Sequence, residues 1–77
     1  MTPAQCRAAR ALISMTQPQL AEASAVGLST VVDFERERRK VSDTSVDSLR
    51  IALERLEVVF IPENGGGAGV RLKKKST

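Results

Sequence analysis

The sequence predicts a single, mainly α-helical domain of four short helices, followed by a strand–turn–strand segment. From residue 3 to residue 56, apolar residues recur at spacings of three and four, as on one face of a helix. The pattern then changes to the β-branched and aromatic run Val58-Val59-Phe60-Ile61, which is typical of a strand. A chain of 77 residues has room for one domain, and 42% hydrophobic with 27% charged residues is a globular composition.

The first two helices are predicted from the same start signal. In this signal Thr caps the helix, Pro lies in its first turn, and Gln follows three residues after the Thr. The signal occurs at Thr2 and again at Thr16, so we expect helices over about residues 3–14 and 17–24. The apolar face of the first helix would hold two pairs spaced four apart: Ala8 with Leu12, and Ala9 with Ile13.

The third and fourth helices are predicted on either side of a polar turn at residues 38–42. A helix over about residues 28–37 would bury Val31 and Phe34, which stand three apart. A helix over about residues 44–56 has the clearest periodicity in the chain. Its apolar stripe consists of Val46, Leu49, Leu53 and Leu56, with Ala52 beside them.

The C-terminal part is predicted to form a hairpin and a tail. A strand over residues 57–61 precedes a glycine-rich turn over 62–69 and a short returning strand over 70–72. A two-stranded hairpin is marginal in water, so it must pack on the helices or pair with a second copy of the chain. We expect the segment 58–72 to contribute to a homodimer, and residues 73–77 to be a disordered basic tail.

Composition excludes several classes of function. With no His and one Cys, neither a disulfide framework nor a multi-Cys/His zinc site is possible, and no metal is expected. Cys6, expected to be half-buried, has no His partner, and the glycine run 65–67 lacks the Lys of a P-loop, so we expect neither an enzyme nor a cofactor. No apolar run is long enough to span a bilayer and no signal peptide is visible, which predicts a cytoplasmic protein without a membrane partner.

The net charge of +3 is distributed unevenly along the chain. Residues 1–35 carry a net −1, residues 36–57 carry +1, and residues 58–77 carry +3. One basic cluster lies where the third helix should end: Arg36, Arg38, Arg39 and Lys40. This basic cluster and the lysine-rich end suit a polyanionic partner, although a solvated turn and a solubilising tail explain the same charges.

Two short helices joined by a tight turn, with helices before and after them, form a helix-turn-helix pattern. The run QPQLAEASAVGLSTVVDFERERR resembles the small Cro/C1-type (XRE family) helix-turn-helix transcriptional regulators of bacteria. It is most similar to the short single-domain versions that end in a strand–glycine–strand tail, here VVFIPENGGGAGVRL. The resemblance covers roughly residues 3–72. It implies a DNA-binding domain over residues 1–57, a homodimer on operator DNA, and the third helix in the major groove.

The resemblance also implies which residues contact double-stranded DNA. The start of the second helix would hold a phosphate near Gln17, and the basic cluster would reach a neighbouring phosphate. Exposed side chains of the third helix would meet phosphate or base edges, where Asp33 could accept a hydrogen bond from a cytosine amine. The full set is Gln17, Gln19, Leu28, Ser29, Thr30, Val32, Asp33, Arg36, Arg38, Arg39 and Lys40.

The chain also departs from the family pattern. Ala25 and Glu37 stand where the family usually has Gly, and Gly27 stands where it usually has a capping Ser or Thr. The predicted reading positions hold no Arg or Gln for a bidentate contact with a base. Exposed Leu28 and Val32 could instead mark a protein contact. The alternative function is therefore an antiactivator, a protein-binding regulator on a helix-turn-helix scaffold with weak or no DNA binding.

Overall fold

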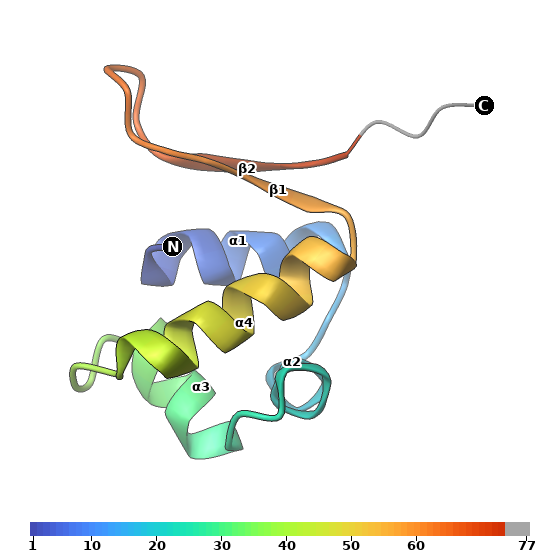
Figure 1. Ribbon diagram of the computed structural model, residues 1–77, viewed down its shortest axis with the longest axis vertical. Helices are drawn as coiled ribbons and strands as arrows, with labels where there is room; N and C mark the ends of the chain where they lie inside the picture. Colours follow the sequence, from blue (N-terminus) through green and yellow to red (C-terminus); the bar gives the residue numbers. More distant parts are fainter. Residues whose placement is uncertain (74–77) are drawn as a thin grey trace.

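The computed structural model describes residues 1–73 and is mainly helical (Figure 1). Its elements are helices α1 (Pro3–Leu12), α2 (Gln17–Ser24), α3 (Leu28–Glu35) and α4 (Asp43–Arg55), and strands β1 (Val58–Ile61) and β2 (Gly69–Leu72). All six predicted elements are present in the predicted order. The predicted disordered tail lies outside the described residues, apart from Lys73.

The start signals of α1 and α2 are confirmed as capping boxes. The hydroxyl of Thr2 accepts from the N–H of Gln5 at 3.0 Å, while Gln5 Oε1 accepts from the N–H of Thr2 at 2.9 Å. Thr16 and Gln19 repeat this exchange at 3.2 and 2.9 Å. Each box satisfies backbone N–H groups that a helix start leaves without a partner.

Each of the four helices is followed, within two residues, by a non-glycine residue in the left-handed conformation. These residues are Ser14, Ala25, Glu37 and Glu57, with φ of 53°, 57°, 56° and 72°. A left-handed residue cannot continue the helix, so α1 and α3 each end two residues before the predicted end. Gly27 has φ of −59° and caps α3 without a side chain.

The two strands form an antiparallel hairpin that packs on α1 and α4, away from α2 and α3 (Figure 1). Pairs opposite each other share a face, so Phe60 and Val70 lie on the inner face with Val58, while Val59 pairs with Arg71 on the outer face. Packing of the hairpin on the helices is thus confirmed. Pairing with a second copy stays a prediction.

A single buried amide ties α1 to the loop end of the hairpin. Nε2 of Gln5 donates to the backbone oxygen of Ile61 at 3.1 Å and to that of Gly69 at 3.0 Å. These two residues oppose each other in the register. Gln5 therefore satisfies both carbonyl groups at the point where the strands separate.

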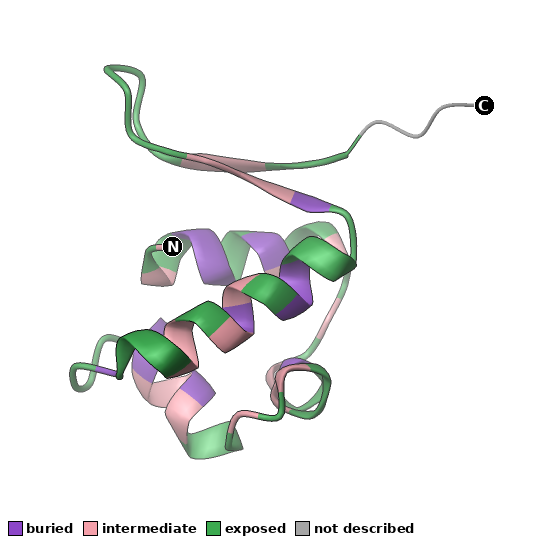
Figure 2. Ribbon diagram, in the orientation of Figure 1, coloured by how far each residue is buried: buried purple, intermediate pink, exposed green. Residues whose placement is uncertain are grey.

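The core lies between the helices and the inner face of the hairpin (Figure 2). Its buried apolar residues are Cys6, Ala9, Leu20, Val31, Phe34, Val41, Leu49, Ala52, Leu53 and Val58. The inward placement of Val31 and Phe34 is confirmed. No helix among residues 1–73 is both long enough and apolar enough to cross a bilayer.

Three predictions about the core are wrong. Ala8 and Leu12 are exposed, because α1 turns the neighbouring face, with Gln5, Cys6 and Ala9, toward the core. Cys6 is fully buried rather than half-buried. Leu56 is also exposed, because α4 ends one residue earlier and the chain turns so that Val58 enters the core instead.

Candidate functional site

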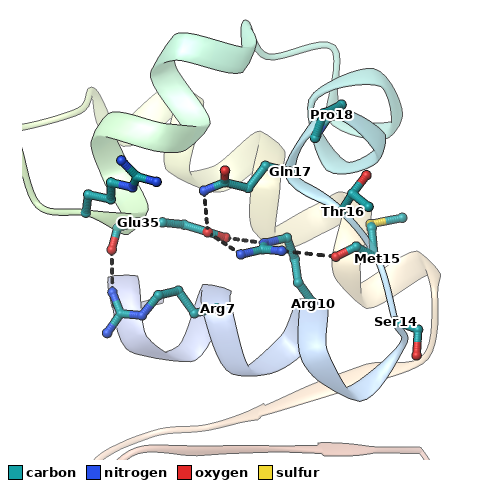
Figure 3. A pocket seen from close by; sticks show the side chains of 9 residues that line it. Arg7, Arg10, Ser14, Met15, Thr16, Gln17, Pro18 and Glu35 are labelled. Atoms are coloured by element: carbon teal, nitrogen blue, oxygen red, sulfur yellow. Dashed lines mark hydrogen bonds and ion pairs between the residues drawn. The ribbon is translucent and has the colours of Figure 1, made fainter.

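A buried carboxylate at the end of α3 joins three helices (Figure 3). Glu35 is fully buried, and the guanidinium of Arg10 on α1 binds it with two bonds of 2.6 Å, from Nε to Oε2 and from Nη2 to Oε1. Nε2 of Gln17, the first residue of α2, donates to Oε1 at 3.0 Å. The thiol of Cys6 donates to Oε2 at 3.2 Å. This Glu35 cluster fixes the start of α2 relative to α1 and α3.

The protonation states in the Glu35 cluster follow from these contacts. Burial by itself would raise the pKa of Glu35, but the hydrogen bonds from Arg10, Gln17 and Cys6 outweigh burial and hold that pKa below its ordinary value. The hydrogen bond to Glu35 raises the pKa of Arg10. Burial, reinforced by Glu35, raises the pKa of Cys6 far above its usual range, which favours the protonated thiol.

An open groove of about 560 Å³ lies beside the Glu35 cluster, at the start of α2 (Figure 3). Arg7 donates from Nη1 to the backbone oxygen of Glu35, and Arg10 Nη1 donates to that of Met15 at 3.0 Å. Arg7 and Arg36 are exposed on this groove. The groove therefore presents cationic groups at the helix start where the resemblance implies a phosphate.

Most polar groups at the start of α2 already have partners within the protein, which limits what this helix start offers a phosphate. The side chain of Gln17 is bound to Glu35, and that of Gln19 closes the capping box. Pro18 has no N–H, and the N–H of Gln19 is bonded to Thr16. Among the first three helical residues, only Gln17 keeps a backbone N–H for an anion, so the arginines would have to supply most of the attraction.

The exposed side of α3 differs partly from the prediction. Leu28, 45% exposed, and Ser29 project outward as expected. Thr30, Val32 and Asp33 are half-buried, so the predicted reading face is less open than expected.

The side chain of Arg39, in the loop that follows α3 in the chain, folds back onto this helix. Its Nε donates to Oδ2 of Asp33 at 2.9 Å, and its Nη2 donates to Oγ1 of Thr30 at 3.3 Å. The sequence suggested that Asp33 alone could accept a hydrogen bond from a base, but in the structure its carboxylate already pairs with Arg39. The structure brings together a predicted reading residue and a predicted phosphate-binding residue.

The remaining members of the basic cluster are all exposed. Arg36 borders the groove at the start of α2, and Lys40 borders a second hollow of about 440 Å³ beside Val41. Within residues 1–73, Arg36, Arg38 and Lys40 form no ion pair. Their charges are therefore available to an anion.

Sequence reasoning missed the Glu35 cluster, although a signal was present. Glu35 stands four residues after Val31, so helix geometry places it on the face that Val31 turns to the core. A carboxylate on such a face requires a buried partner. Arg10, four residues after Cys6 on α1, is that partner.

No protein-family model matches this chain, and none of the curated proteins compared with it matches it in sequence. Within the described residues, no three His, Cys, Asp or Glu side chains lie together in a way that could hold a metal ion. The function must therefore be inferred from the contacts of this chain itself.

Proposed function

We propose that the protein is a transcriptional regulator of the Cro/C1-type helix-turn-helix class that binds operator DNA as a homodimer, with α3 in the major groove. The observation that carries the proposal is the joint placement of α3 and the arginine-lined groove. The Glu35 cluster holds the start of α2, the groove with Arg7 and Arg36 lies there, and Arg36 also follows α3 directly. A helix with cationic groups beside it suits the major groove of DNA, because phosphates flank that groove.

The basic cluster supports the same proposal. Arg36, Arg38 and Lys40 are exposed and unpaired by acidic side chains within residues 1–73, and they continue the charge of the groove beyond α3. Neutralising phosphates releases counterions, so these residues should add affinity for any duplex DNA. They contribute no sequence preference.

The position of the hairpin supports the dimer. The hairpin packs on α1 and α4, at the end of the molecule opposite to α2 and α3 (Figure 1). A dimer formed through the outer face or the free edges of the hairpin would leave α3 unobstructed. Unpaired strand edges favour such pairing.

DNA binding is tested with the duplex upstream of the protein's own gene, by fluorescence anisotropy at several salt concentrations. We expect binding that weakens with salt, and the variant Arg36→Ala/Arg38→Ala should lower affinity for specific and random duplexes alike. The log–log salt slope should fall by about one unit for each phosphate that the variant no longer neutralises.

The matched control is Arg50→Ala, which removes one positive charge from α4, where Arg50 pairs with Asp47 and Glu54. This control should keep both affinity and slope. A changed base preference with an unchanged slope in the double variant would show that the basic cluster has another role.

An antiactivator that binds a partner protein is the second candidate, and the exposure of Leu28 at the start of α3 is what favours it. In that case the folded protein would show no affinity for DNA even at low salt. Replacement of Leu28 by Ala would then abolish binding to the partner regulator. If the protein instead reads DNA, the same change should cost little, because a methyl contact is weakly directional.

A further inference from the structure

The predicted reading positions on α3 contain no arginine or glutamine, yet an arginine from the loop after α3 contacts two side chains of this helix. Arg39 follows α3 by four residues and folds back so that its guanidinium contacts Thr30 and Asp33, which are three apart on α3. Residues three apart lie on the same side of a helix. The guanidinium is thus fixed to the exposed side of α3, although its backbone belongs to the loop.

The two contacts occupy one edge of the guanidinium. Nε and the adjacent hydrogen of Nη2 form the side edge of the fork, and Asp33 and Thr30 accept from these two nitrogens. The outer edge, formed by Nη1 and the other hydrogen of Nη2, points away from the side chain. Among the described residues, no hydrogen bond is made by that outer edge. Two parallel N–H groups therefore remain for a bidentate acceptor.

Exposure and charge agree with this geometry. The side chain of Arg39 is 51% exposed, whereas that of Asp33 is 24% exposed, so the guanidinium is the more accessible member of the pair. A carboxylate left alone on α3 would repel DNA, and Arg39 neutralises it. The ion pair also limits the rotamers of a long side chain, which lowers the entropy lost when that side chain binds a base.

We propose that Arg39 is the base-reading residue of this protein, that its outer edge donates to O6 and N7 of a guanine in the major groove, and that Asp33 and Thr30 are positioning residues. This inference rests on the proposed function. Guanine is the base whose major-groove edge carries two adjacent acceptors, which match the two parallel donors of a guanidinium. A phosphate can accept the same pair of bonds, and the experiment separates the two.

The test selects bound sequences from a random duplex pool with the full chain and with three variants: Arg39→Lys, Asp33→Ala and Asp33→Ala/Arg39→Lys. Lys keeps the charge and loses the two parallel donors. For Arg39→Lys we expect the preference for guanine at one position of each half-site to fall by about 5- to 150-fold, with the salt slope unchanged. The matched control is Arg38→Lys, in the same loop, where Arg38 has no ion pair within residues 1–73, and it should keep the preference.

The double variant tests the positioning role. Asp33→Ala should weaken the preference at the same guanine as Arg39→Lys, and the double variant should weaken it no further, because both changes remove one interaction. A purely structural role of Asp33 would lower affinity for all sequences equally. Circular dichroism of each variant checks that the helices are intact.

Each other outcome overturns a defined statement. If the unaltered protein enriches no sequence, the proposed function fails, and the reading role of Arg39 fails with it. If it enriches an operator and Arg39→Lys keeps the same preference, only the inference fails and Arg39 is a phosphate contact. If Asp33→Ala changes the preference at a cytosine while Arg39→Lys leaves that preference unaltered, Asp33 itself reads a base, and the roles proposed for the two residues are wrong.

Discussion

Removing Arg10 alone should destabilise the fold far more than replacing Arg10 and Glu35 together. In Arg10→Met, the carboxylate of Glu35 stays fully buried and keeps only the hydrogen bonds from Gln17 and Cys6. Leaving one member of a buried pair without its partner costs about 3–5 kcal/mol. A domain of this length has a total stability of about 4–12 kcal/mol. Arg10→Met should therefore bring the protein close to unfolding at room temperature.

The double variant Arg10→Met/Glu35→Met removes both charges and fills the space with apolar side chains of similar length. Exchange of a buried ion pair for apolar residues is often neutral or stabilising, so we expect its stability within about 1 kcal/mol of the original. Gln17 is half-buried and can bond to water once Glu35 is gone. The single changes Arg10→Met and Glu35→Met should consequently be strongly non-additive, with a coupling energy of about 3 kcal/mol.

Urea unfolding followed by circular dichroism at pH 7 measures these differences. Arg50→Ala, which breaks exposed pairs on α4, is the control and should change stability by less than about 1 kcal/mol. If Arg10→Met costs less than the control, or the double variant costs as much as the two single variants summed, the Glu35 cluster does not hold the three helices as described.

Three further predictions concern acid, backbone strain and assembly. Because the pKa of Glu35 is lowered in the folded state, its contribution to stability is present above the ordinary Glu pKa of about 4.3 and is lost as pH falls through the lower folded value. Between pH 7 and pH 3, the urea midpoint should therefore fall more steeply for the original protein than for Arg10→Met/Glu35→Met. Ala25→Gly should raise the melting temperature through a gain of about 1 kcal/mol, since glycine adopts φ of 57° without strain. Ala23→Gly, at an exposed position inside α2 without positive φ, should instead lower the melting temperature, and an equal gain there would contradict the strain account. Val59→Lys, on the outer face of the hairpin opposite Arg71, should shift the protein to monomer in analytical sedimentation with its helical signal intact, and an unchanged sedimentation coefficient would place the dimer elsewhere or exclude it.

Local rules were sufficient for much of the fold. The capping boxes at Thr2 and Thr16 depend on residues within one helical turn, so both helix starts could be read directly. The change from helical to strand periodicity at Val58 is also local. Helix ends were harder to predict, because the usual signal at a helix end is glycine and this chain ends its helices with residues such as Ala25 and Glu37.

The contacts on which the two proposals depend are non-local, and they could not be predicted from the sequence. Glu35 lies 25 residues from Arg10, and only the packing of α1 against α3 brings the two together. The sequence predicts that Arg39 contacts a phosphate and that Asp33 contacts a base, because nothing in their spacing shows that the loop folds back on α3. In the structure the two side chains contact each other. Spacing predicts which residues share a helix face, but it does not predict which partner crosses from another element.

The amide of Gln5 has a consequence for the order in which this chain folds. Its two acceptors lie 56 and 64 residues away along the chain, so among the hydrogen bonds of residues 1–73 these two close the largest loops. Short-range contacts between successive helices can form earlier, and the hairpin finds its anchor only once α1 is in place. The hairpin amides and those of α1 should thus open as one cooperative unit in native-state hydrogen exchange, so that a change in α1 lowers the protection of the hairpin.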